Sequence, residues 1–383
     1  MVEALPPLSL YIHFPWCVKK CPYCDFNSHS VGRGDIPEAD YVQALKNDLD
    51  RELVFVQGRP LNSIFFGGGT PSLMSAAAVE AVLDHARRQI GFVENMEITL
   101  EANPGTAERE RFRDYRSVGV NRISLGVQSF DEQQLQRLGR IHGVDDVWRA
   151  VDMLQAAAFD NYNLDLMFAL PGQTVAEALA DLQRAIDCGP SHLSWYQLTL
   201  EPNTVFYREK PALPDDDLQY EIWQAGRETL QGQGYSQYET SAYSRPGREC
   251  VHNRHYWEFG DYLGIGAGAH GKVSALSGQG WSVHRRQKTR LPEHYLRRVD
   301  PCSAMGELSE AELLCEFAMN GLRLREGVPV SLFQQRTGLP AHCLEGVAGS
   351  LRKQGLLVED PGRFATTERG ALFLNKVLEA FLP

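Results

Sequence analysis

The chain has 383 residues, with 38 Lys or Arg against 49 Asp or Glu, so its formal net charge is −11. This acidic balance disfavours a nucleic-acid-binding protein, which normally carries a basic surface. No apolar run approaches the roughly 20 residues that cross a bilayer, although a peripheral membrane contact stays compatible with the composition. Since no charged segment followed by an apolar stretch opens the chain, we expect a cytoplasmic protein.

The first predicted strand, residues 8–15, leads directly into three cysteines, Cys17, Cys21 and Cys24. Three thiolates can hold three irons of a four-iron cluster and leave the fourth iron open to a small ligand, whereas clusters with four cysteines usually only carry electrons. The spacing therefore predicts a [4Fe-4S] cluster with one open iron.

Two other interpretations of these thiols, a zinc site and disulfides, have less support. A zinc site would need His13 or His29 as a fourth ligand, and three tightly spaced thiols after a strand fit structural zinc poorly. Disulfides are disfavoured because cytosolic thiols stay reduced. The other cysteines stand singly in apolar or helical patterns, and we assign them no role: Cys188, Cys250, Cys302, Cys315 and Cys343.

Strand-like and helix-like segments alternate along the first two thirds of the chain. The predicted strands are residues 8–15, 63–66, 96–101, 122–127, 162–170 and 192–200, several of them apolar on both faces. Predicted helices 41–56, 76–90 and 175–187 end near Gly58, Gly91 and Gly189, and Thr174 with Glu177 forms a capping box. This order predicts an α/β fold with right-handed crossovers, an incomplete parallel (β/α)6-type barrel.

Polar residues fall where the predicted strands end, the edge at which ligands bind in such folds. The run from Gly67 to Pro71 follows the second strand, and its bare backbone can approach a ligand closely. Glu101, Gln128 and Asp165 lie at or within the next three strands. Buried polar side chains are costly unless they face a cavity with partners, so the set predicts a site at this rim. Arg140 could return to the same rim with a guanidinium suited to a carboxylate.

Five segments together resemble one family: LYIHFPWCVKKCPYCDF, FFGGGTPS, LEANP, GVNRISLGVQSF and NLDLMFALPGQT. They are similar to the radical S-adenosylmethionine (SAM) branch that contains oxygen-independent coproporphyrinogen III oxidase and a heme chaperone. The resemblance spans most of residues 8–270 and implies cluster ligation by Cys17, Cys21 and Cys24. It also implies SAM contacts from Tyr11, the backbone at Tyr23, Gly68, Gly69, Thr70 and Glu101. Gln128, Arg140 and Asp165 match positions that serve a second bound SAM in the oxidase.

Two departures from the oxidase favour the chaperone. The oxidase carries a further cysteine where this chain has Phe26, and an extension before the first strand, which here begins at Leu8. Without that extension the cavity at the strand ends would be more open to water, which is a poor setting for a radical intermediate. Decarboxylation of coproporphyrinogen is therefore doubtful.

A later segment, residues 250–257, resembles the HNxxYW segment of the heme chaperone. A neutral imidazole is a good axial ligand to heme iron, so His252 is the candidate ligand, with Cys250 or His255 as alternatives. Arg254 could meet a propionate, and the neighbouring rings could flank the porphyrin. The glycines of residues 262–270 lack the features of a dinucleotide fingerprint, and His270 is a weaker candidate SAM contact.

From about Leu308 the pattern becomes helical, with predicted helices 308–321, 330–337 and 341–354 before a short hairpin. It resembles a small winged-helix domain, which divides the chain into residues 1–300 and 301–383. Residues 308–383 hold 8 basic and 9 acidic side chains, so DNA binding is disfavoured.

The sequence as a whole predicts a heme chaperone that carries a [4Fe-4S] cluster and SAM and passes heme to acceptor proteins. The alternatives are the coproporphyrinogen dehydrogenase and another radical SAM enzyme acting on a small molecule. The sequence leaves open whether SAM is cleaved, and it does not identify the heme acceptor.

Overall fold

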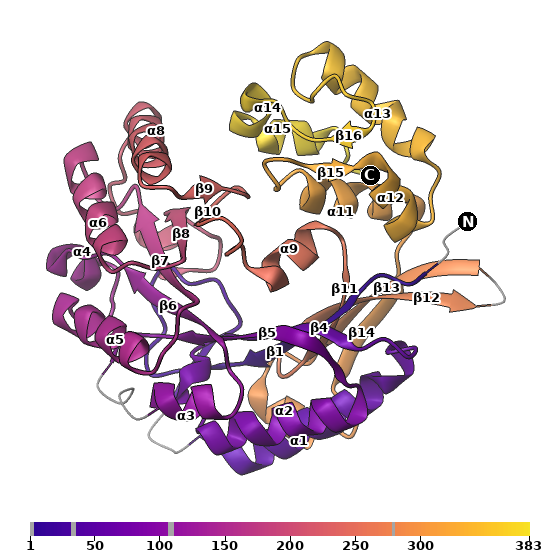
Figure 1. Cartoon of the computed structure of the whole chain (residues 1–383), viewed down its shortest axis with the longest axis horizontal. Coiled ribbons are helices and arrows are strands. Elements are labelled where there is room, and N and C mark those ends of the chain that lie inside the picture. Colours follow the sequence, from indigo (N-terminus) through magenta and orange to yellow (C-terminus); the bar gives the residue numbers. More distant parts are fainter. Residues whose placement is uncertain (1–3, 32–35, 106–110, 278–279) are drawn as a thin grey trace.

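The computed structural model describes residues 4–31, 36–105, 111–277 and 280–383, and a 12-stranded sheet forms its centre. Six neighbouring strands are parallel and curve into an open barrel (Figure 1). In sheet order they are β1 (Leu8–Phe14), β4 (Leu61–Gly68), β5 (Phe92–Ala102), β6 (Arg122–Gln128), β7 (Tyr162–Phe168) and β8 (His192–Gln197). The predicted incomplete parallel barrel is confirmed.

Amphipathic helices cover the outer face of this barrel (Figure 1). The longer ones are α1 (Glu38–Glu52), α2 (Ala76–Gln89), α5 (Val144–Ala156), α6 (Val175–Asp187) and α8 (Asp216–Gly232). Gly58, Gly91 and Gly189 have positive φ angles of 75°, 85° and 69°, as expected of left-handed helix stops. The capping box at Thr174 and Glu177 is also present. The predicted start of this helix and the predicted glycine stops are therefore confirmed.

Further strands extend both edges of the parallel core. On the β8 side lie β10 (Ala242–Ser244) and β9 (Ser236–Gln237), both antiparallel. On the β1 side, β11 (Asp261–Ile265) is parallel to β1, and β12 (His270–Ser277), β13 (Gly280–Lys288) and β14 (Cys302–Glu307) continue antiparallel. In the described chain the sheet ends at β14 and β9, which leaves the barrel unclosed.

A small helical unit follows the sheet (Figure 1). It contains α11 (Glu310–Gly321), α12 (Val330–Thr337), α13 (Ala341–Lys353), α14 (Glu368–Leu372) and α15 (Leu374–Glu379), with β15 (Val328–Pro329) paired to β16 (Arg363–Phe364). Phe317, Phe333 and Phe364 form its core, which also takes in Phe259 and Val283 from the sheet side. The helices agree with the winged-helix-like expectation, while the division at residue 300 stays a prediction.

Shorter elements complete the fold: β2 (Trp16–Cys17), β3 (His29–Ser30), η1 (Leu53–Phe55), η2 (Pro71–Leu73), α3 (Arg111–Ser117), α4 (Glu132–Arg137), α7 (Val205–Glu209), α9 (Val251–Trp257) and α10 (Pro292–Arg297). Among the described residues, no helix is both long and apolar enough to cross a membrane.

Candidate functional site

The three predicted cluster cysteines line one cavity of about 390 Å³ at the carboxyl ends of the parallel strands. Cys17 ends β2, directly after β1, and Cys21 and Cys24 follow in the same loop. The backbone fixes this loop, since the amide of His29 donates to Pro15 and that of Val31 donates to Cys17, both at 2.7 Å. The sequence therefore brings three thiols into one wall of a cavity.

These thiols do not form a site for a single metal ion. A zinc ion with bonds of about 2.3 Å would hold its sulfur ligands roughly 4 Å apart. In the described chain, no group of three or more His, Cys, Asp or Glu side chains could hold one ion. A four-iron cluster takes one thiolate on each of three irons, so it fits a wider triangle of sulfurs. The three thiolates of this loop fit the cluster.

The glycine-rich run after β4 packs tightly against the cluster loop. The amides of Gly69 and Thr70 donate to the carbonyls of Phe14 and Trp16, each at 2.7 Å. A Cβ at Gly69 would lie 2.4 Å from the Trp16 oxygen, and one at Gly68, where φ is +114°, would lie 2.6 Å from the ring of His13. The glycines are thus required by contact with the loop, while Gly68, Gly69 and Thr70 also line the cavity.

Two partly buried carboxyl groups lie on the wall of this cavity. Burial, with the nearby carboxyl of Asp165, raises the pKa of Glu101 to about 8, although the amide of Gly68 donates to Glu101 at 3.1 Å. Burial also raises the pKa of Asp165, whose oxygens accept from Asn163 at 2.7 Å and from Ser124 at 3.1 Å. A nearby positive charge favours the ionised form of a carboxyl, so the cationic groups of SAM would be stabilised by Glu101 and Asp165 and would lower their pKa values again.

Glu101 gives the cluster-free protein a defined pH dependence. Between about 4.5 and 8 the unfolded carboxyl loses its proton while the folded one keeps it, so the folded state binds more protons. The free energy of unfolding is therefore expected to fall as the pH rises across this range. Glu101→Gln is expected to flatten that slope, as measured by urea unfolding at successive pH values. Equal slopes in the two proteins would contradict the raised pKa.

Gln128 and Arg140 reach the same cavity by different routes. Gln128 ends β6 at a register shift against β7 and has φ of 72°, unusual for a residue other than glycine. Arg140, after α4, donates to Gly126 at 2.7 Å and to the sulfur of Cys21 at 3.5 Å. Its Nε is buried and unpaired. Both side chains lie where the sequence predicted them.

Of the remaining predicted SAM contacts, one lines the cavity and two do not. Tyr23 lines the cavity and packs on Phe206. Tyr11 is not among the lining residues: its ring stacks on Phe65, and its hydroxyl lies 3.0 Å from Nδ1 of His13. A SAM contact from Tyr11 therefore stays a prediction, and His270, also absent from the lining, is in the same position.

Several lining residues were not predicted from the sequence, and two of them, Asn103 and Tyr196, lie close to predicted ones. Asn103 donates to Thr70 at 3.0 Å and accepts from Arg140, so it connects the glycine run to the guanidinium. Tyr196 lies near the end of β8 and lines the cavity, where the charge of Asp165 acts on its hydroxyl. Asn103 stands two residues after Glu101, and Tyr196 stands near the end of the sixth strand, so strand-end position was the available signal.

The predicted heme ligand, His252, lies inside the barrel on α9. It is 1% exposed, its Nδ1 is 2.8 Å from the hydroxyl of Ser63, and its Nε2 is 2.9 Å from that of Tyr256. The ring also stacks on Phe65. Since both nitrogens have partners, iron coordination by His252 would require α9 to move, and this role stays a prediction.

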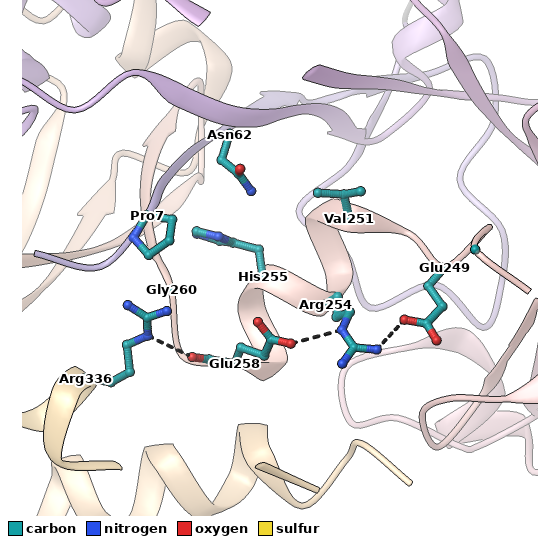
Figure 2. A pocket seen from close by; sticks show the side chains of 10 residues that line it. Pro7, Asn62, Glu249, Val251, Arg254, His255, Glu258, Gly260 and Arg336 are labelled. Carbon is teal, nitrogen blue, oxygen red and sulfur yellow. Dashed lines mark hydrogen bonds and ion pairs between the residues drawn. The ribbon is translucent and has the colours of Figure 1, made fainter. Parts of the chain in front are cut away.

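Other residues of the same motif are also engaged. Arg254 pairs with Glu249 and Glu258 (Figure 2) and also with Glu326, so it is not free to meet a propionate as expected. The thiol of Cys250 is buried and donates to Glu97 at 3.4 Å.

The motif also connects the barrel to the C-terminal unit. Tyr256 packs edge-on against Tyr262, whose hydroxyl accepts from Arg285, and Arg285 pairs with Glu316 of α11. Trp257 lies under the guanidinium of Arg323.

His252→Ala is expected to destabilise the fold by about 3 kcal/mol, because it leaves the hydroxyls of Ser63 and Tyr256 buried without this partner and removes a stacked ring. Urea unfolding checks the value. His342→Ala, at an exposed position of α13, is the control and is expected to stay within about 0.5 kcal/mol of wild type. A similarly small effect at His252 would show that these contacts are weak.

Comparisons with known proteins agree with this geometry. Residues 11–185 match the radical SAM superfamily model, and residues 308–373 match the HemN C-terminal domain. The chain is 50% identical over 378 residues to heme chaperone HemW of Escherichia coli K12, covering 99% of both chains. It belongs to the HemW family of radical SAM proteins.

Other relatives and one solved structure are also similar to this chain along most of its length. HemW of Haemophilus influenzae is 49% identical over 99% of this chain and 98% of its own. The mouse mitochondrial radical S-adenosyl methionine domain-containing protein 1 is 36% identical over 98% of this chain and 87% of its own. Coproporphyrinogen III oxidase (HemN) of E. coli superposes with a TM-score of 0.82 over 98% of this chain and 90% of that chain. At 22% identity this likeness shows the fold alone.

Membership in the radical SAM superfamily implies a [4Fe-4S] cluster and SAM as bound groups. The three thiols, the glycine run and the acidic wall described above fit both groups. The expectation drawn from the five sequence motifs is therefore confirmed at the level of the family, which implies the cluster and SAM.

Proposed function

We propose that this protein is a heme chaperone: it binds heme and transfers it to acceptor proteins while carrying a [4Fe-4S] cluster and SAM. The observation that carries the proposal is the 50% identity to E. coli HemW across 99% of both chains. Cys17, Cys21 and Cys24 would hold the cluster, with SAM between the glycine run and Glu101. When bound, the cluster supplies one-electron chemistry at its open iron.

The charge of the cavity supports the chaperone over the oxidase. Its lining contains two basic side chains against four acidic ones: Lys19 and Arg140, then Asp25, Glu101, Asp165 and Glu201. Coproporphyrinogen carries several carboxylates, which Asp25 and Glu201 would repel, and which Glu101 and Asp165, whose pKa values burial raises, would repel once a bound cation ionises them. At the position of the oxidase cysteine, Phe26 stands on the cavity rim and is 60% exposed. Both features disfavour coproporphyrinogen as the substrate.

One anaerobic preparation tests the proposal. The reconstituted protein is titrated with hemin and, separately, incubated with coproporphyrinogen III, SAM and a reductant. We expect a saturable heme spectrum and no protoporphyrinogen. Formation of protoporphyrinogen would assign the oxidase activity instead, and SAM cleavage stimulated by some other small molecule would assign a third function.

Transfer needs a separate measurement. Heme-loaded protein is mixed with an apo heme protein, and the spectrum of the acceptor is followed against free hemin at the same concentration. A chaperone is expected to load the acceptor while losing its own heme spectrum. Retention of the heme by the loaded protein with every acceptor would leave storage, and not transfer, as its role.

A further inference from the structure

A smaller cavity of about 250 Å³, which we call the side cleft, adjoins the cavity of the three thiols. The two cavities share Lys19, Cys21, Thr70, Asn103 and Arg140. Cys21 therefore lines both, whereas Cys17 and Cys24 belong to the lining of the larger one. The other residues of the side cleft are Val18, Ser72, Leu73, Pro104, Gly105, Arg111, Gly139 and Ile141. The side cleft is a second approach to the predicted cluster, away from Glu101 and Asp165.

The side cleft differs in charge from the larger cavity, whose lining is mainly acidic. Its described lining contains three cationic side chains, Lys19, Arg111 and Arg140, and no carboxylate. Arg111 donates to the carbonyl of Ser72 at 2.8 Å, and Arg140 donates to that of Gly126 at 2.7 Å. Within the part of the chain that the structure describes, none of the three cations pairs with a carboxylate. Positive charge is thus concentrated here on a chain of net charge −11.

Two lining residues of the side cleft are aliphatic and exposed. Val18, in the cluster loop, is 54% exposed, and Ile141, directly after Arg140, is 61% exposed. Lys19 between the loop residues is exposed as well. An apolar centre with a charged rim is the usual composition of a protein-docking surface. The side cleft therefore has the character of a contact for another protein.

A [4Fe-4S] cluster that supplies one-electron chemistry must receive its electron from a donor outside the chain. In that step the donor is oxidised by one electron and the cluster is reduced by one, and no bond forms or breaks. SAM would occupy the larger cavity, and the acidic side chains there would repel a negatively charged donor. The side cleft instead offers such a donor an attractive surface that reaches Cys21.

We propose that the side cleft is the docking surface for an acidic one-electron carrier protein, which passes its electron to the cluster through Cys21. Val18 and Ile141 form the apolar centre of the contact, and Lys19 and Arg111 meet carboxylates of the carrier. Electron-transfer complexes commonly bury less than about 1,200 Å², so a surface of this small extent is sufficient. The inference rests on the cluster that the family implies and does not depend on heme transfer.

Local charge governs this contact, although both proteins are acidic as a whole. At about 0.1 M salt the Debye length is about 10 Å, so exposed charges farther away are largely screened. The carboxylates of the carrier then interact mainly with the cations of the side cleft. At about 1 M salt the Debye length is about 3 Å, and the complex is expected to weaken.

Titration of the full-length reconstituted protein with an oxidised acidic flavodoxin tests the docking, with flavin fluorescence as the readout. We expect saturable binding at about 0.1 M salt and about tenfold weaker binding at about 1 M. Lys19→Glu and Ile141→Asp are each expected to weaken binding by about tenfold at the lower salt. Lys353→Glu, with the same charge change at an exposed position of α13, is the matched control and is expected to bind like wild type.

Reduction of the cluster gives a second readout. After anaerobic mixing with reduced flavodoxin, bleaching of the cluster absorbance is expected to be about tenfold slower in Lys19→Glu and Ile141→Asp. Photoreduced 5-deazariboflavin is a small uncharged reductant that needs no docking surface, so we expect equal rates with it in all variants. Ile141 does not line the larger cavity, so its variant separates docking from any effect on SAM.

Hydrogen exchange locates the contact. On addition of flavodoxin, exchange is expected to slow at the amides of residues 18–21 and 139–141. Protection confined to other segments would overturn the inference. So would the absence of saturable binding, wild-type affinity in both variants, or equal slowing of both variants with 5-deazariboflavin. The hemin titration described above is independent of these measurements, so a failure of the docking surface and a failure of the chaperone function are distinguishable.

Discussion

Cys21→Ala is expected to lower bound iron from about four atoms per chain to near zero after anaerobic reconstitution. Cys21 lies between Cys17 and Cys24 in the wall of the cavity, and its sulfur accepts from Arg140. Removal of one thiolate from a set of three leaves two irons without a protein ligand. Iron and sulfide assays, with the visible absorbance of the cluster, check the result.

Cys302→Ala is the matched control, since Cys302 lies in β14 and does not line the cavity. It is expected to keep the full cluster. Wild-type iron and sulfide in Cys21→Ala, or zinc in place of iron in the wild-type protein, would contradict the assignment of the three thiols.

Gly69→Ala is expected to weaken SAM binding by at least about tenfold. The new Cβ would lie 2.4 Å from the backbone oxygen of Trp16, and a backbone atom cannot swing away as a flexible side chain can. The end of β4 must therefore separate from the cluster loop, which breaks the bond from the Gly69 amide to Phe14 and displaces Cys17. Calorimetric titration of the reconstituted protein with SAM measures the loss.

Gly346→Ala is the control for adding a methyl group to a glycine without a close contact. Gly346 lies within α13, where an added Cβ would meet nothing within 4 Å. It is expected to leave SAM binding unchanged and to stabilise the helix by about 1 kcal/mol. If Gly69→Ala bound SAM as tightly as the control, the close contact between the glycine run and the loop would not shape the SAM site.

Local signals determined most of the barrel. The predicted helix 175–187 matches α6 in both bounds, and 330–337 matches α12 in the same way. The six parallel strands were found within a few residues at each end because apolar periodicity and glycine stops act over neighbouring positions. Strand-end polarity likewise identified Glu101, Gln128 and Asp165, since parallel strands bring their carboxyl ends to one rim.

Only the tertiary structure decided what surrounds the HNxxYW segment. The sequence favoured His252 as the heme ligand and predicted a heme propionate as the partner of Arg254. The fold instead buries His252 against Ser63 and pairs Arg254 with three carboxylates. Ser63 belongs to β4 and Glu326 to the C-terminal unit, so no local pattern reports these two partners, whereas Glu249 and Glu258 stand within five residues of Arg254. A hydrogen-bond partner from another element depends on how the whole chain packs, and the sequence of one segment does not contain that information.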